Sequence, residues 1–229
     1  MAEHVEAFFA YKLEYQTAVK QNENPNSLRL RLDRDARFYR EQGYPDKEAL
    51  FGDTVVSFWT IYKQLLRLKT GLKKGSSAET FAYLLEQSRS PQEDEETLAI
   101  RALNETLEPL AAMIDTAGNF MLLPKRGMNP ERYAVSEDRI DITLYECFSG
   151  GKLSHYFEHD DALRQWILKE HFECLFTDGI IEKENLIWGV NSRKMITGLD
   201  EQELYQYMDY AMQMIAYRNE ACSGTAKER

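Results

Sequence analysis

Apolar residues recur along this chain with the three- and four-residue spacing of amphipathic helices, whereas strict alternation of apolar and polar residues is scarce. The clearest case follows Asp53, a residue type that caps helices, so we expect a helix to begin there. The apolar side of this helix would consist of Val55, Phe58, Trp59, Tyr62, Leu65 and Leu66. The pattern therefore predicts a mainly α fold.

Further helices are expected where a capping residue or a glycine bounds a similar apolar stripe. These stretches are 5–13, 27–43, 76–90, 160–176 and 200–218. We expect one compact multi-helix domain over 1–229, with room for one small β-hairpin or short strands in the second half. Any subdivision would fall near 72–92, where the sequences GLKKGSS and SRSPQEDEE resemble linkers.

For the segment 139–157, the sequence is compatible with either a helix or a β-hairpin. Asn129 and Pro130 are typical of a helix start, and Gly150 and Gly151 of a helix end. The β-rich residue types between them also favour a hairpin that pairs ITLYECF with KLSHYF. We favour the helix, and IIEKENLIWGV is read as two small strands or as irregular.

The stretch 115–129 reads DTAGNFMLLPKRGMN and interrupts the helical pattern. Gly118 and Asn119 are residue types that tolerate positive φ, so they are predicted to end the preceding helix in a sharp turn. The apolar run after them, with Leu122 and Leu123, would then enter a core.

Composition excludes several classes of protein. The formal charge of −10 argues against binding to nucleic acid or an anionic membrane unless a local basic patch exists. No apolar run reaches the roughly 18 residues of a membrane span, and the start of the chain lacks a signal-peptide core, so we expect a cytoplasmic protein. The spacing of the three cysteines shows no pairs, which is typical of reduced thiols rather than disulfides. They are Cys147, Cys174 and Cys222.

Candidate chemistry is sparse. His155, His159, His171 and Cys174 are four soft ligands that zinc would accept, but we favour core and capping roles because zinc patterns have tighter pairs. A carboxylate cluster suits magnesium or acid–base chemistry, but helix starts collect carboxylates. Its members are Asp138, Asp141, Glu158, Asp160 and Asp161. No GxSxG, P-loop, GxGxxG or HExxH sequence occurs, and no cofactor is expected.

Two basic segments interrupt the acidic background. One contains Lys63, Arg67, Lys69, Lys73 and Lys74, and the other contains Arg29, Arg31, Arg34, Arg37 and Arg40. Phosphate would dock on either, yet acidic residues alternate with the arginines, which is typical of a solvated helix with ion pairs.

The sequence GNFMLLPKRGMN resembles the GNLxLL…N block that follows the catalytic histidine in the helical HNH nuclease portion of GmrSD-type, modification-dependent restriction proteins of bacteria. The resemblance covers about a dozen residues. It implies structural asparagines at Asn119 and Asn129 and a buried leucine run. The family's upstream histidine has no counterpart, because no histidine lies between His4 and His155.

We therefore interpret the chain as a binding or interaction protein. The alternative is a degenerate or unusual HNH-like hydrolase of a defence system that uses His155, His159 or Asp141. The C-terminal helix carries a second stripe with Tyr207, Tyr210 and Tyr217, which is read either as core or as a homodimer interface.

Overall fold

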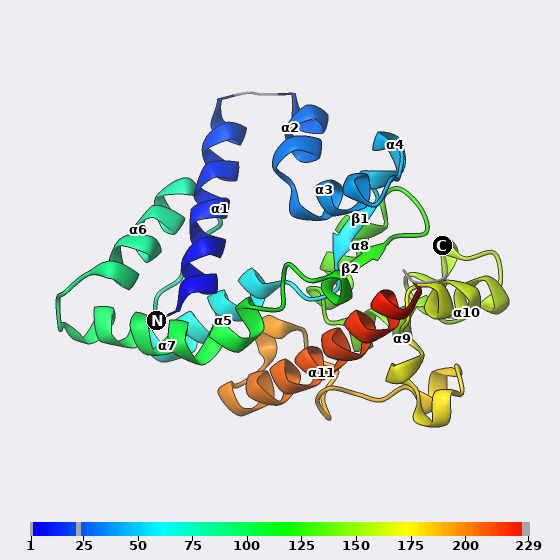
Figure 1. The fold of residues 1–229 in the computed structure, drawn as a ribbon. Helices are drawn as coiled ribbons and strands as arrows, with labels where there is room; N and C mark the ends of the chain where they lie inside the picture. The colour runs from blue at the N-terminus through cyan, green and yellow to red at the C-terminus, as the bar shows by residue number, and fades with distance from the viewer. Residues whose placement is uncertain (1, 22–23, 226–229) are drawn as a thin grey trace. The chain divides into compact units, whose positions relative to one another are not determined.

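The computed structural model describes residues 2–21 and 24–225, and it confirms a mainly α fold (Figure 1). In this described part the only strands are β1 (Gly52–Thr54) and β2 (Phe120–Leu122), which pair antiparallel. No helix in the same part is both long enough and apolar enough to cross a membrane.

The chain divides into two compact units. Unit 1 comprises the described residues up to Leu50 together with Ile61–Ile114, and unit 2 comprises Phe51–Thr60 and the described residues from Asp115 onward. The expected subdivision near 72–92 does not coincide with this division, because that stretch lies entirely inside unit 1.

Unit 1 consists of helices. They are α1 (Glu3–Lys20), α2 (Pro25–Leu32), α3 (Arg34–Glu41), α4 (Asp46–Ala49), α5 (Phe58–Thr70, in unit 1 from Ile61), α6 (Ala78–Arg89) and α7 (Glu95–Ala111). Helix α1 lies beside α6 and also contacts α7 (Figure 1). The single helix expected over 27–43 is interrupted at Asp33, whose backbone is extended, so two helices form instead.

The core of unit 1 is aromatic, and one polar chain crosses it. The rings of Phe9 and Tyr62 meet edge to face with centroids 5.0 Å apart. The Tyr62 hydroxyl donates to Asn104 Oδ1 at 2.8 Å, and Asn104 Nδ2 donates to Ser88 Oγ at 2.7 Å. These buried polar groups are therefore bonded to one another, which removes the cost of leaving them unpaired.

Unit 2 joins the small sheet to helices and 3₁₀ turns. Its helices are α8 (Met128–Ser136), α9 (Ile140–Cys147), α10 (Asp160–Lys169) and α11 (Glu201–Thr225). Its 3₁₀ turns are η1 (Ala117–Asn119), η2 (Ser154–Tyr156), η3 (Glu173–Leu175), η4 (Thr177–Gly179), η5 (Lys183–Asn185) and η6 (Ile196–Gly198).

The prediction that Asp53 caps a helix is wrong. Asp53 lies in β1 opposite Met121 of β2, and α5 begins five residues later, at Phe58. Asp53 does not cap the helix because its carboxylate pairs with the buried guanidinium of Arg132, with 2.8 Å between Asp53 Oδ2 and Arg132 Nη1. Ser57, the residue before α5, accepts a bond from the Thr60 amide at 3.4 Å.

The segment 139–157 forms a helix and a turn. Helix α9 covers the predicted ITLYEC stretch, so the helix prediction is confirmed and the hairpin alternative is wrong. The helix predicted over 160–176 ends at Lys169, seven residues early, because His171 adopts a left-handed φ of 56°. The 3₁₀ turn η3 occupies part of the remaining range, and η4 follows directly after it.

Gly118 was expected to adopt positive φ, and this expectation is wrong. Helix α7 ends at Ala111, and residues 117–119 form the turn η1 with its N-terminal side extended. Gly118 is instead required by close packing, because a Cβ atom there would lie 2.2 Å from the carbonyl oxygen of Ile215 in α11. The apolar run enters the core through Phe120, Met121 and Leu123, whereas Leu122, also expected there, is half-buried.

Candidate functional site

A fully buried arginine fixes the sheet of unit 2 to α8. The guanidinium of Arg132 lies 2.8 Å from Asp53 Oδ2 and 3.0 Å from Asp138 Oδ1. It also donates to the carbonyl oxygens of Thr54 and Val55 at 3.1 and 2.7 Å. Burial, together with the charge of Asp53, raises the pKa of Asp138 to about 6, although Arg132 opposes that shift.

A second buried pair connects α9 to the loop that follows η5. Arg139 Nη2 lies 2.6 Å from Asp141 Oδ2, and neither side chain is exposed. Asp141 also accepts the Gly189 amide at 3.0 Å, while Arg139 Nη1 donates to the carbonyl oxygens of Ser192 and Lys194 at 2.9 and 2.5 Å. Asp141 is thus a structural anchor for 189–194, and its role as a catalytic acid or base in the alternative interpretation stays a prediction.

This anchored loop places two cations and two aromatic rings together on the surface of unit 2. We name Tyr145, Lys183, Trp188 and Arg193 the Tyr145 cluster. The rings of Tyr145 and Trp188 have centroids 5.4 Å apart. Lys183 Nζ lies 4.3 Å and Arg193 Cζ 4.1 Å from the centroid of Tyr145, and Arg193 is also 5.1 Å from that of Trp188.

The two cations of the Tyr145 cluster have no ion pair with any residue that the structure describes, and both lie against aromatic rings. Because each lies just over 4 Å from one ring centre, the charges are within about 8 Å of each other, where their repulsion is roughly 0.5 kcal/mol in water and 2 kcal/mol near a protein surface. Arg193 is exposed, and the other three side chains are half-buried. The cluster therefore presents an uncompensated positive charge beside an aromatic surface.

The four histidine and cysteine residues that were considered as zinc ligands do not form a metal site in the described part of the chain. No group of three or more histidine, cysteine or acidic side chains within the described residues has the geometry to hold a metal ion. His155 Nε2 lies 3.2 Å from Glu131, and His159 Nδ1 accepts the Ala162 amide at 3.1 Å as the cap of α10. Burial raises the pKa of the Cys174 thiol to about 11, so its reactive thiolate is disfavoured.

The carboxylate cluster is also dispersed. Asp138 forms an ion pair with Arg132, and Asp141 forms one with Arg139. Both were expected to cap helices, and neither does so. Asp160 lies inside the first turn of α10, where His159 takes the capping role. Asp161 pairs with Arg164 at 2.9 Å within the same helix.

The tyrosines of the α11 stripe form hydrogen bonds within unit 2. Tyr207 is buried, and its hydroxyl accepts the Ile140 amide at 3.1 Å, so it cannot face a partner as the homodimer interface required. The Tyr210 hydroxyl donates to the Ile187 carbonyl at 3.1 Å. Tyr217 is 41% exposed and donates to Glu173 at 3.0 Å.

The segment that resembles the HNH block has structural contacts. Asn119 Oδ1 accepts the Val56 amide at 3.0 Å, and the Asn119 carbonyl accepts the Val55 amide at 2.7 Å, so this buried asparagine extends the β1–β2 pairing. Asn129 lies in the first turn of α8. Within the described residues, the catalytic candidates His155 and His159 form no hydrogen bond or ion pair with this segment or with Asp141.

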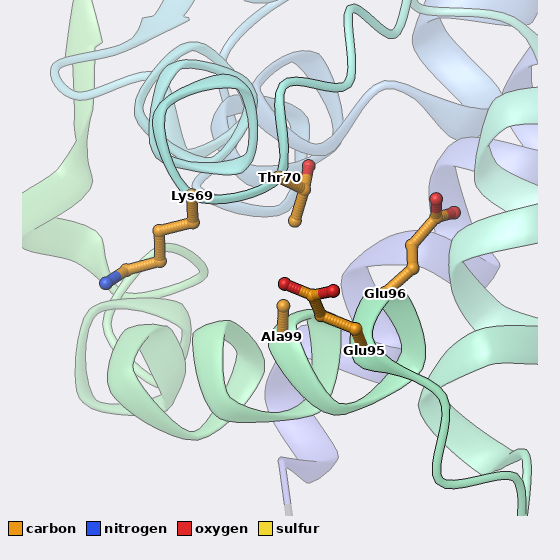
Figure 2. Close-up of a pocket in the computed structure, with 5 residues that line it drawn as sticks. All are labelled: Lys69, Thr70, Glu95, Glu96 and Ala99. Atoms are coloured by element: carbon orange, nitrogen blue, oxygen red, sulfur yellow. The ribbon is translucent and has the colours of Figure 1, made fainter.

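A surface hollow of about 310 Å³ lies within unit 1, between the end of α5 and the start of α7 (Figure 2). Its lining is Lys69, Thr70, Glu95, Glu96 and Ala99. The Thr70 hydroxyl already donates to the Leu66 carbonyl at 2.7 Å, and Figure 2 shows the Lys69 ammonium pointing away from the two carboxylates. The hollow thus lacks a converging pair of reactive groups.

The arginine segment 29–40 forms ion pairs with neighbouring acidic residues, as its sequence predicted. Arg29 Nε lies 3.1 Å from Asp33, and Arg37 Nε lies 4.0 Å from Glu41. Sequence reasoning missed the Tyr145 cluster because no short motif joins its members. Tyr145 precedes the other three residues by 38 to 48 positions, and those three are 5 to 10 positions from one another.

Comparison with known proteins adds no assignment: no protein-family model matches the sequence, no curated protein matches it, and no solved structure matches the fold.

Proposed function

We propose that this protein acts by binding, and that the Tyr145 cluster takes an acidic segment of a partner protein. The observation that carries the proposal is the pair of cations, Lys183 and Arg193, stacked on one tyrosine ring without a carboxylate partner among the residues that the structure describes. A bound carboxylate would relieve their repulsion and form charge-assisted hydrogen bonds. Arginine and aromatic side chains are also the types enriched where binding energy concentrates.

A peptide suits the cluster better than a nucleic acid does. The cluster offers two cations, whereas sequence-independent DNA binding typically rests on six to ten phosphate contacts, roughly. The chain's charge of −10 repels a long polyanion more than a segment with one or two carboxylates. Ile187, which precedes Trp188, is 41% exposed and adds apolar surface for an aliphatic or aromatic side chain of the segment.

Selection from a displayed random peptide library tests the proposal. The wild-type protein should enrich sequences in which Asp or Glu accompanies Leu or Phe, and the double variant Lys183→Gln/Arg193→Gln should not. The double variant Lys125→Gln/Lys152→Gln is the matched control, because it removes the same charge from exposed positions in unit 2. Equal enrichment on all three proteins, or enrichment without acidic residues, would refute the proposal.

A selected peptide then allows a quantitative test by fluorescence anisotropy. Loss of both cations should weaken binding about tenfold or more, equivalent to about 1.4 kcal/mol. Replacing the peptide's acidic residues by Asn and Gln should have a similar effect. A single-stranded oligothymidine that bound more tightly than the peptide would show that the cluster is a nucleic-acid surface instead.

A further inference from the structure

The most acidic stretch of the chain lies in unit 1, at the start of α7. Residues 93–98, which we name the 93–98 segment, read EDEETL and contain the only four consecutive acidic residues of the sequence. Asp94 caps the helix, because its Oδ1 atom accepts the Thr97 amide at 2.9 Å. Glu93 lies before this cap, outside the helix, and Glu95 is the first helical residue.

The outer carboxylates of the 93–98 segment are accessible and are not neutralised. Glu93 and Glu95 are exposed, and neither forms an ion pair with another residue in the described part of the chain. Arg101, a cation of the same helix, donates instead to the Gln92 carbonyl at 3.1 Å. Figure 2 shows the Lys69 ammonium pointing away from Glu95. The segment therefore presents an uncompensated negative charge to solvent.

The 93–98 segment also carries an exposed apolar side chain. Leu98 is 46% exposed, and it follows Glu95 by three positions in α7, so the two side chains are neighbours on one face of the helix. The Tyr145 cluster offers the counterpart of each, since its two cations lack an ion pair among the described residues and Ile187 beside Trp188 is exposed. Opposite charges and apolar surface thus occur together at both places.

We propose that the 93–98 segment binds the Tyr145 cluster of a second copy of this chain. The inference rests on the proposed function, because it names the partner protein and the segment that the cluster takes. The Cα atoms of Glu93 and Glu95 are at most roughly 7 Å apart, which suits two cations within about 8 Å of each other. Each carboxylate faces one cation, and Leu98 covers the apolar surface at Ile187.

The net charge of −10 on each copy does not prevent this contact at physiological salt. The Debye length there is about 8 Å, so repulsion between distant charges of two copies is largely screened, whereas partly buried ion pairs are screened much less. Because the segment and the cluster are different surfaces, two copies can exchange both contacts or each copy can bind two neighbours. In either arrangement the association depends on protein concentration.

Sedimentation velocity of the full chain at physiological salt, at concentrations up to about 0.1 mM, tests the inference. We expect the wild type to associate as its concentration rises. The variants Glu93→Gln/Glu95→Gln and Lys183→Gln/Arg193→Gln should each remain monomeric alone. An equimolar mixture of the two variants should form pairs and nothing larger, because it retains one intact cluster and one intact segment for each pair. Such pairing would also show that both variants are folded.

The double variant Glu14→Gln/Glu105→Gln is the matched control, because it removes two carboxylates from exposed helical positions of unit 1, and it should associate as the wild type does. A monomeric wild type, variants that associate like the wild type, or a mixture that does not pair would overturn the inference. If peptides selected from the library bind to a wild type that stays monomeric, the inference fails and the proposed function stands. If the selected peptides do not bind either, both fail.

Discussion

Replacement of Gly118 by alanine should destabilise unit 2 strongly. The added Cβ atom would lie 2.2 Å from the Ile215 carbonyl oxygen and 2.9 Å from the Asn219 amide nitrogen, both in the backbone of α11. Ordinary contacts of carbon require about 3.5 Å, so η1 and α11 must separate by roughly 1 Å. Backbone atoms cannot rotate away as a flexible side chain can.

The separation would also weaken the contacts that hold α11 to η1 and β2. The Gly118 amide donates to Asn219 Oδ1 at 2.6 Å, and the Arg218 guanidinium donates to the carbonyl oxygens of Gly118 and Phe120. Overpacking costs about 1 to 3 kcal/mol, and a bond to a charged group contributes about 1.5 to 3 kcal/mol. With the bonds lengthened but not lost, we expect Gly118→Ala to lower the free energy of unfolding by about 3 kcal/mol.

Tryptophan fluorescence during urea unfolding measures this effect selectively, because Trp59, Trp166 and Trp188 all belong to unit 2. Gly198→Ala is the control, since a Cβ there would approach the Lys194 side chain at 3.3 Å, which that side chain can relieve. We expect the control to cost less than about 1 kcal/mol. A Gly118→Ala protein within about 0.5 kcal/mol of wild type would refute the close-packing explanation.

Three other predictions follow from buried and capping groups. The pKa of the Asp138 carboxyl is raised to about 6 in the folded chain. Protonation of this carboxyl therefore stabilises the folded state at acid pH, and this stabilisation is lost as pH rises through 6. From pH 7.5 to pH 5, the free energy of unfolding of wild type relative to Asp138→Asn should increase by about 1 kcal/mol, measured by urea titration. Asp141→Ala leaves the Arg139 guanidinium buried without its carboxylate, which should lower the free energy of unfolding by about 3 to 5 kcal/mol. Acrylamide quenching of Trp188 should increase, because the loop loses its bond to Asp141. Unchanged quenching would show that Asp141 does not anchor the loop. His159→Ala should cost about 1 kcal/mol in thermal melts through loss of the α10 cap, with His159→Asn close to wild type; equal losses in both variants would contradict the capping role.

Local patterns predicted the helices and missed what depends on distant residues. The apolar stripe of α5 and the glycines that follow α9 are local signals, so the sequence was sufficient to find these two helices. Asp53 failed as a helix cap because a capping residue type does not reveal a buried arginine that lies 79 positions away. The sequence indicated that a glycine is required at 118, but it is required because α11 packs closely against it. This tertiary contact cannot be predicted from local sequence rules.

The Tyr145 cluster was equally inaccessible from sequence. Tyr145 lies in a helix, Lys183 in a 3₁₀ turn, and Trp188 and Arg193 in a loop, so no periodicity connects them. The buried Arg139–Asp141 pair brings the loop to the helix, and charged residues at helix starts are ordinarily read as caps. Only the folded chain distinguishes such a pair from a surface one.

The position of β1 in the chain determines an order of folding during synthesis. Residues 51–60 are translated early, but β2, the partner of β1, follows roughly seventy residues later. By that time the whole of unit 1 has been translated, since its last segment ends at Ile114. Because domains fold as units from the N-terminal side as they are made, unit 1 should fold on the ribosome while β1 is still unpaired. A nascent chain stalled so that residues up to 114 have left the ribosome exit tunnel, while β2 is still inside it, should therefore resist protease throughout 61–114 and remain cleavable within 51–60.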